Sequence, residues 1–208
     1  LLKVDGNLIL SGNAAAEFTS SGSVGAEENR IKGDVNISGL NSNFNMGSHA
    51  VILSVNGDVN INGGNTCFSK TPGISQVSVN RNFSLQSGTF VLKGHEGMSE
   101  LILNGAYSQT GGVFYLHSNT LSATNDSVKV YFKSSFRQWN GIINFDDNPV
   151  GGKSVLYIQG NEFIAKGSSL ITRAGTGSAF GAMVFGTNGD LNYQRSAASV
   201  IDQIKQSI

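Results

Sequence analysis

Cysteine, histidine and proline are scarce in this chain. Its 208 residues include one cysteine, Cys67, three histidines and two prolines. A single cysteine cannot form an intrachain disulfide, and no Cys or His stands near Cys67 at metal-ligand spacing. We therefore predict no disulfide, no metal site and no cofactor, and we expect Cys67 to be a small core residue.

Charge is sparse as well. Charged residues make up 13% of the chain, and 14 basic residues balance 14 acidic ones. This balance leaves no broad field that would attract nucleic acid, so we predict no nucleic-acid partner. No apolar run is long enough to span a membrane, and no segment has the pattern of a signal peptide. We expect targeting signals to lie in a longer precursor, whose other domains would be partners of this segment.

What the chain does contain is a repeat of the form apolar-x-Gly-x-apolar-x-apolar. Its third position is occupied in turn by Gly6, Gly33, Gly57, Arg81, Gly105, Ser134, Gly160 and Gly189. The three intervals between Gly33 and Gly105 are equal, and the other intervals are slightly longer. Three equal intervals in a row are hard to obtain by chance, and a period of about 24 residues is typical of a solenoid.

Within each repeat, apolar and polar residues alternate with the two-residue period of a strand that has one buried face. Tyr107 shares one inward position with Val59 and Phe83. Three further columns recur at equivalent positions, and we predict that each is a buried ladder: Leu53, Val77, Leu101, Val130 and Leu156; Val55, Val79, Leu103, Phe132 and Ile158; and Phe44, Phe68, Leu92, Leu116, Phe145 and Ile171.

These columns predict an all-β fold, a right-handed parallel β-helix (β-solenoid) of about eight coils over residues 1–195. Each coil stacks on the next at about 4.8 Å and buries its inward face against its neighbours. An antiparallel sandwich also has short strands, but it does not predict columns that recur once in every repeat. Residues 196–208 place apolar side chains on one helical face, with Ser196 as N-cap. We expect a short C-terminal amphipathic helix that covers the last coil or begins a following segment.

Motifs of catalysis are missing from the sequence, which has no nucleophile elbow, no phosphate-binding loop and no His-x-x-x-His pair. Asp146 and Asp147 are adjacent carboxylates, and parallel β-helices often carry polysaccharide-cleaving sites. Neighbours on a strand point to opposite faces, however, and Asp-Asp-Asn-Pro is typical of a turn. His49, His95 and His117 are expected at the surface. We predict no catalytic residues and no enzymatic activity.

Two aromatic residues, Tyr131 and Trp139, alternate outward from their strands. Exposed aromatic rings can stack on sugar rings, so these two are candidates for a sugar-stacking surface.

Three phrases resemble repeats in large surface and secreted proteins of the Bacteroidetes, among them gliding-motility adhesins exported by type IX secretion. The phrases are GDVNISG (33–39), NFSLQSGTF (82–90) and GAYSQTGGVF (105–114). The resemblance implies a secreted or cell-surface protein, with secretion machinery, a surface polysaccharide, or a host or substratum ligand as partners. Asp126-Ser127-Val128 matches the short O-glycosylation acceptor pattern of that phylum, which makes Ser127 a candidate site. The sorting domain that such proteins carry at the C-terminus is not visible in this chain.

Two functional hypotheses remain. The first is a non-catalytic structural or adhesive segment of a bacterial surface or secreted protein, which requires only a rigid, neutral rod. The alternative is a carbohydrate-binding or polysaccharide-cleaving β-helix module. That alternative needs outward acids, bases or aromatic residues gathered on adjacent coils.

Overall fold

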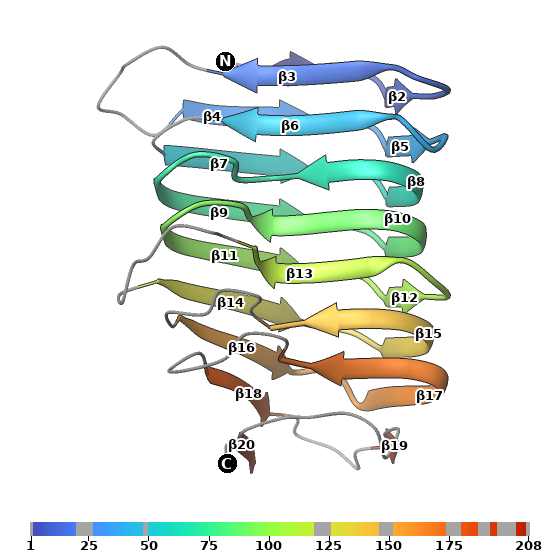
Figure 1. Ribbon diagram of the computed structural model, residues 1–208, viewed down its shortest axis with the longest axis vertical. Coiled ribbons are helices and arrows are strands. Elements are labelled where there is room, and N and C mark those ends of the chain that lie inside the picture. The colour runs from blue at the N-terminus through green and yellow to red at the C-terminus, as the bar shows by residue number, and fades with distance from the viewer. Residues whose placement is uncertain are drawn as a thin grey trace.

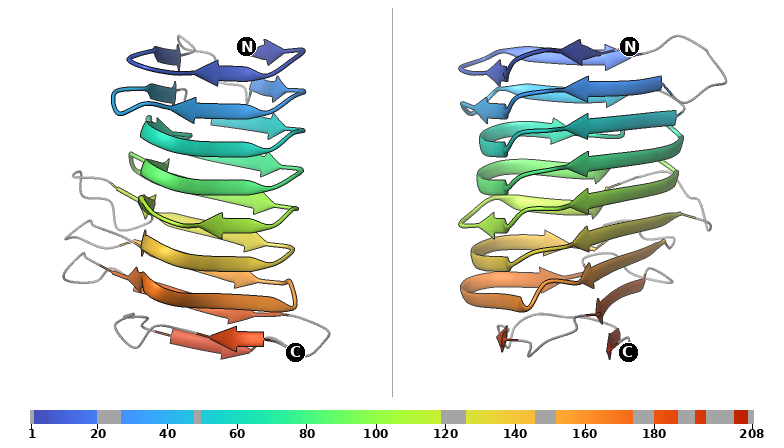
Figure 2. Two further views of the ribbon diagram at one scale, coloured as in Figure 1. Left: turned by 90° about the vertical axis from the view of Figure 1, so that its right-hand side faces the viewer. Right: turned by 180° about the vertical axis from the view of Figure 1, so that it is seen from behind.

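The chain winds into a β-solenoid whose coils stack into a rod (Figures 1 and 2). The computed structural model describes residues 2–19, 27–47, 50–118, 126–145, 152–173, 180–186, 192–194 and 203–206. Every regular element in these ranges is a β-strand, and neighbouring coils pair in parallel. In Figure 1 the front strands run leftward and the rear strands rightward as the chain descends, which makes the winding right-handed. The predicted parallel β-solenoid is therefore confirmed.

Nine strands form one side of the rod, which we call sheet A. In stacking order they are β1 (Lys3–Val4), β4 (Glu27–Ile31), β7 (Ala50–Val55), β9 (Gly73–Val79), β11 (Gly97–Leu103), β14 (Ser127–Phe132), β16 (Lys153–Ile158), β18 (Phe180–Phe185) and β20 (Gln203–Gln206).

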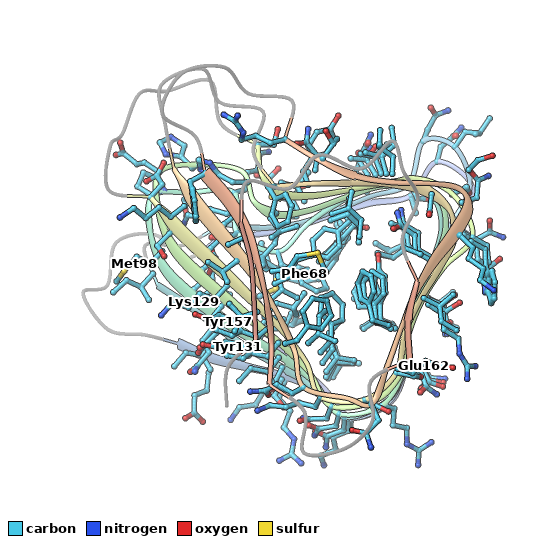
Figure 3. All side chains as sticks on the ribbon, turned by 90° about the horizontal axis from the view of Figure 1, so that it is seen from below. Phe68, Met98, Lys129, Tyr131, Tyr157 and Glu162 are labelled. Atoms are coloured by element: carbon cyan, nitrogen blue, oxygen red, sulfur yellow. The ribbon has the colours of Figure 1, made fainter. Side chains whose placement is uncertain are left out.

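The other two sides belong to a second sheet of 11 strands, sheet B, which bends around a corner of the cross-section (Figure 3). At this corner Gly64 and Gly141 have φ of 66° and 88°, a conformation that glycine adopts without steric penalty. The strands of sheet B are β2 (Leu8–Leu10), β3 (Ala15–Thr19), β5 (Val35–Ser38), β6 (Asn43–Gly47), β8 (Val59–Cys67), β10 (Phe83–Lys93), β12 (Tyr107–Gln109), β13 (Val113–His117), β15 (Phe136–Asn144), β17 (Glu162–Thr172) and β19 (Asn192–Gln194).

The two columns predicted for sheet A are confirmed by its register. Leu53 pairs with Val77, and Val77 pairs with Leu101, which begins a chain of partners that continues through Val130 to Leu156. The column that starts at Val55 and Val79 continues in the same way to Ile158. All of these side chains are buried, so sheet A turns one apolar face inward.

The third predicted column is wrong in register, although its residues do face the core. Phe44 pairs with Thr66, two residues before Phe68, and Ile171 pairs with Ile143, two residues before Phe145. A shift of two residues keeps a side chain on the same face of a strand, which is why all six predicted residues are buried. The structure has one column of register partners here, Phe44, Thr66, Phe90, Phe114, Ile143 and Ile171. Phe68, Leu92, Leu116 and Phe145 lie two residues farther along their coils and are buried beside it.

Aromatic rings stack along the core of the rod. Phe83, Tyr107, Phe136 and Phe163 follow one another in register, and their ring centroids are 5.8, 5.1 and 4.5 Å apart. Tyr107 is fully buried, as its column predicts. Its phenol donates to Gln109 Oε1 at 3.0 Å, so the hydroxyl group is satisfied inside the core.

Polar ladders join the coils on the outside. The amide of Asn80 donates to Asn56 Oδ1 at 3.2 Å, and that of Asn104 donates to Asn80 Oδ1 at 3.1 Å. Next to this ladder, Asp58 Oδ1 accepts the backbone N–H of Asn82 at 2.8 Å. Asp34 Oδ1 accepts the N–H of Asp58 in the same way, also at 2.8 Å. These bonds explain why Asn or Asp recurs directly after the repeat glycine.

The ends of the rod differ from the prediction. The solenoid makes about six turns, so the expectation of eight coils is wrong in its count. At the N-terminal end, β1 has only two residues. At the C-terminal end, the coil that contains β18 and β19 has no described strand on the side of the rod where β3, β6 and β13 lie.

The predicted C-terminal helix is also wrong for residues 203–206, which form β20 and pair in parallel with β18. Ile204 lies in register with Met183, at the next position of the Leu53 column. The open edge of sheet A offers these residues backbone hydrogen bonds that outweigh their helical periodicity. The remainder of 196–208 lies outside the described residues, and the boundary between residues 195 and 196 stays a prediction.

Candidate functional site

The outer face of sheet A brings together more of the predicted candidates than any other described surface. Met98, Lys129, Tyr131 and Tyr157 all project from this side of the rod, whereas Phe68 points into the core (Figure 3). A shallow groove of about 290 Å³ crosses the face. Its outward lining residues are Ile74, Gln76, Met98, Glu100, Ser127 and Lys129.

Tyr131 faces outward, as predicted, but it does not offer a free ring face on both sides. It stacks on Tyr157 of the next coil, with ring centroids 4.6 Å apart and planes inclined by 8°. Lys133 Nζ lies 5.6 Å from the Tyr131 ring centroid. Partial burial, followed by the negative charge of the nearby Glu100, raises the pKa of the Tyr131 phenol. The tyrosine pair therefore presents ring edges and hydroxyl groups to the solvent.

Trp139 also faces outward and is 44% exposed, but it lies far from Tyr131 in the fold. It belongs to β15 of sheet B, at a bulge where the pairing with β17 shifts register. The two aromatic candidates are thus on different sides of the rod, and they do not form one sugar-stacking platform.

Ser127, the candidate for O-glycosylation, is the first residue of β14 and lies in register between Met98 and Lys153. Its side chain lines the groove on sheet A. A glycan on Ser127 would cover this face. Its glycosylation stays a prediction.

Asp146, Asp147 and His49 lie outside the described residues. The predicted surface position is wrong for His117, which is 1% exposed. His117 belongs to a buried polar cluster that the sequence did not predict.

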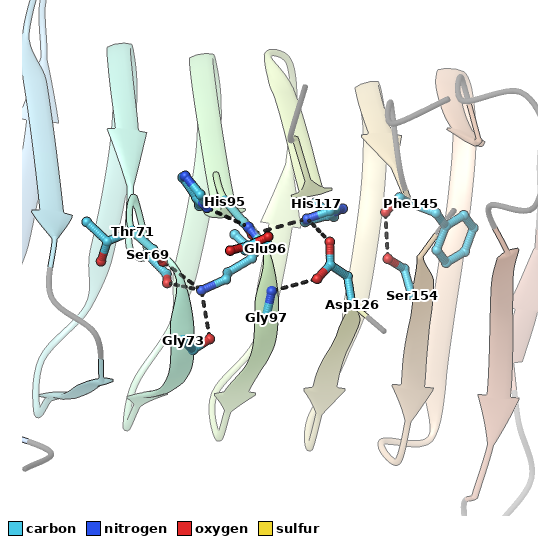
Figure 4. A network of polar contacts seen from close by, with 11 residues as sticks. Ser69, Thr71, Gly73, His95, Glu96, Gly97, His117, Asp126, Phe145 and Ser154 are labelled. Carbon is cyan, nitrogen blue, oxygen red and sulfur yellow. Dashed lines mark hydrogen bonds and ion pairs between the residues drawn. The ribbon is translucent and has the colours of Figure 1, made fainter. Parts of the chain in front are cut away.

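The buried cluster consists of Lys93, His117 and Asp126. Lys93 ends β10 of sheet B just before the chain enters β11 of sheet A, and Figure 4 shows His117 and Asp126 at this corner. Lys93 is fully buried, and its ammonium group donates to Ser69 Oγ at 2.9 Å, Thr71 O at 2.9 Å and Gly73 O at 3.0 Å. All three N–H donors of a charged lysine therefore have acceptors.

Asp126 joins the next two coils to this corner. Its Oδ1 accepts the backbone N–H of Gly97 at 2.6 Å, and its Oδ2 lies 3.3 Å from His117 Nε2. The same ring nitrogen lies 3.2 Å from His95 O. Because the three side chains are almost inaccessible to solvent, they hold the corner together and do not form an open reaction site.

Burial lowers the pKa of Lys93 to about 8, and the Asp126 carboxylate opposes this shift. An unfolded lysine titrates near 10.4, so between about pH 8 and 10 the unfolded chain binds more protons than the folded chain. The Lys93 contribution to stability therefore rises as the pH rises through this range. Cys67 acts in the opposite direction, because burial raises the pKa of its thiol.

We expect the Lys93→Met variant to lose this pH dependence. The difference in unfolding free energy between wild type and variant should shift by about 2 kcal/mol in favour of wild type between pH 7 and 9.5. Urea denaturation at a series of pH values measures this difference, and the opposing effect of Cys67 cancels because both proteins contain it. If the difference in unfolding free energy stayed constant between pH 7 and 9.5, the lowered pKa of Lys93 would be contradicted.

One signal in the sequence could have located Lys93 and His117. They occupy equivalent positions one repeat apart, and each directly follows an inward leucine, Leu92 or Leu116. Strict alternation places them outside, but the chain turns at the end of both strands, and two consecutive side chains are buried there. Alternation fails at the strand end because it holds only while the backbone stays extended.

Cys67 was expected in the core but lies half-buried, on the outward side of β8 in register with Asn45 and Val91. In the part of the chain that the structure describes, no three His, Cys, Asp or Glu side chains are placed to hold a metal ion. The same residues include no helix of the length and hydropathy needed to cross a membrane.

In comparisons with known proteins, no family model, no curated protein and no solved structure matches this chain.

Proposed function

We propose that this chain is a non-catalytic structural or adhesive segment of a secreted or cell-surface bacterial protein. The observation that carries the proposal is the use of polar side chains to join one coil to the next. Asp34 and Asp58 accept backbone N–H groups of the following coil, and Asn56, Asn80 and Asn104 form a continuous amide ladder. Such groups are committed to coil stacking and do not converge on a reacting atom.

The interior supports the same proposal. Lys93 and Gln109 are fully buried polar residues, and both donate to backbone carbonyl groups near corners of the solenoid. These contacts fix the path of each coil, and the stacked aromatic rings fill the space between the sheets. Stacked coils of this kind give an elongated rod, the shape required of a spacer or of an adhesive stalk.

A carbohydrate-binding module is the second candidate, and one observation favours it. The groove on sheet A carries the polar side chains Gln76, Glu100 and Lys129 beside apolar Ile74 and Met98, a combination that suits a sugar chain. The stacking of Tyr131 on Tyr157 weakens this candidate, because the ring faces that contact each other are not open to a sugar ring.

A polysaccharide panel tests the proposal. We expect the purified chain to release no reducing ends from plant, algal or bacterial polysaccharides, because Glu100 is the one carboxylate among the described outward positions of β9, β11, β14 and β16, whereas glycoside hydrolysis typically needs two. Beads coated with the chain are then passed over the same polysaccharides under flow: retention identifies a segment that binds carbohydrate, the second candidate, and free passage favours a structural segment.

Release of reducing ends would contradict the proposal. The double variant Asp146→Asn, Asp147→Asn is the control for that outcome, since these adjacent carboxylates are the candidates that the sequence offers for cleavage. Loss of a cleaving activity in the double variant would assign the site to these two carboxylates.

A further inference from the structure

The outer face of sheet A carries little charge over its central strands β9, β11, β14 and β16. Ile74 (58% exposed) and Met98 (48% exposed) are register partners on β9 and β11, so they form one apolar strip. Ile102, Tyr131 and Tyr157 form a second strip farther along the strands. Contiguous apolar surface on a sheet face is typical of an interaction site.

The charged residues on this face are few and regularly placed. Among the described outward positions of β9, β11, β14 and β16, the charged side chains are Glu100, Lys129 and Lys153. Glu100 and Lys129 are register partners on the adjacent strands β11 and β14, between the two apolar strips. The face therefore has a negative and a positive charge side by side near its middle.

We propose that a second copy of this chain binds to this face through a twofold axis that runs parallel to the strands between β11 and β14. Such an axis exchanges β11 with β14, and β9 with β16. Glu100 of each copy then faces the partner's Lys129, so the interface contains the same ion pair twice, as an isologous interface requires.

The other side chains that face each other across this twofold axis are also compatible. Met98 faces the partner's Ser127, and Ile102 faces the partner's Tyr131. Ile74 faces the partner's Lys153, whose methylene stem can cover apolar surface while its ammonium group stays in water. Among the outward positions of β9, β11, β14 and β16, no charged side chain faces a like charge.

The same charges select the antiparallel arrangement of the two rods. An axis parallel to the rod, through the column of Glu100 and Lys129, would place Glu100 against the partner's Glu100 and Lys129 against the partner's Lys129. Like charges in contact strongly disfavour an interface. The proposal thus goes beyond a structural or adhesive role and specifies how two segments associate side by side.

Charge reversal tests the proposal, with sedimentation equilibrium as the readout. We expect the wild type to form dimers, and we expect Glu100→Lys and Lys129→Glu each to raise the dimer dissociation constant at least tenfold, because each creates two like-charge contacts. An equimolar mixture of the two variants should form heterodimers, because each lysine of the first then faces a glutamate of the second. In each variant chain, residues 100 and 129 carry the same sign of charge, alone or in the mixture. Recovery of dimers in the mixture therefore reports only contacts between copies.

Glu162→Lys is the matched control. It makes the same change of charge on sheet B, where Glu162 pairs with Arg137 at 2.6 Å, and it should dimerise like wild type. Met98→Arg changes an exposed residue, should fold normally by circular dichroism and should be monomeric. This variant tests the face even if a reversal variant fails to fold.

A wild type that stays monomeric over the full concentration range would overturn the proposal, and so would a mixture that forms no heterodimers. A monomer that binds soluble oligosaccharides through Glu100 and Lys129 would also overturn it, in favour of a carbohydrate ligand on this face.

Discussion

Replacing Phe68 with alanine should destabilise the protein by about 3–5 kcal/mol, the usual range for removing a large aromatic side chain from a core. Phe68 is fully buried, and its ring lies 5.9 Å from that of Phe44 and 4.9 Å from that of Phe90, in both cases nearly perpendicular. Its backbone N–H donates to Val91 O of the next coil at 3.0 Å. Truncation therefore removes contacts in both directions along the rod.

The loss should be local at first, because each coil contacts only its neighbours. Limited proteolysis of Phe68→Ala should cut within about one repeat of the substitution. Leu40→Ala is the matched control, since Leu40 is 90% exposed and its truncation should change neither the melting temperature nor the cleavage pattern. If Phe68→Ala also left both unchanged, the assignment of the inward column would be wrong.

Replacing Gly64 with alanine should have the second large effect. Gly64 has φ of 66°, and a Cβ atom there would lie 2.1 Å from the carbonyl oxygen of Ser42 in the coil before it. The left-handed conformation costs alanine roughly 1–2 kcal/mol. The contact with the backbone should add a further ~1–3 kcal/mol, the range typical of overpacking.

Gly12→Ala separates these two contributions. Gly12 has nearly the same φ, 67°, but no heavy atom lies within 4 Å of the position its Cβ would take. Gly12→Ala should therefore show the conformational cost alone. Chemical denaturation of both variants measures the difference, and equal destabilisation at the two sites would contradict the close approach of the coils at Gly64.

The regular part of the solenoid could be predicted from the sequence because it depends on a repeated local pattern. Leu53 and Val77 occupy equivalent positions in successive repeats, and stacking of identical coils makes them neighbours in sheet A. The repeat glycine and the Asn or Asp that follows it could be recognised for the same reason. These residues occupy the same corner in several successive coils.

Features that do not repeat could not be predicted in this way. Phe44 lies two residues out of the predicted register, because the chain from Val35 to Phe44 is two residues longer than the chain from Val59 to Thr66 that pairs with it. Residues 203–206 have helical periodicity, yet they form β20 because the edge of sheet A offers backbone partners. His117 and Asp126 meet across an insertion, and no local pattern specifies such a contact.

The candidate surface was only partly predictable. Alternation along β14 showed that Tyr131 faces outward, but its contact with Tyr157 depends on which strands are neighbours. The pairing of Glu100 with Lys129 has the same origin, since these residues are separated by a coil of irregular length. Surface chemistry on a solenoid is thus determined by the register between coils as much as by the repeat.

Disulfide mapping across sheet A tests the parallel, in-register stacking most directly. Ser54 and Ser78 are register partners on β7 and β9 and both face outward. Adjacent strands lie about 4.8 Å apart, a separation that a disulfide can bridge. In a Cys67→Ser background, the variant Ser54→Cys, Ser78→Cys should form an intrachain disulfide, detected by mass spectrometry of unreduced peptides. Ser54→Cys with Ile102→Cys, two strands apart at about 9.6 Å, should not form one. A disulfide in the second variant and none in the first would contradict the stacking on which this account depends.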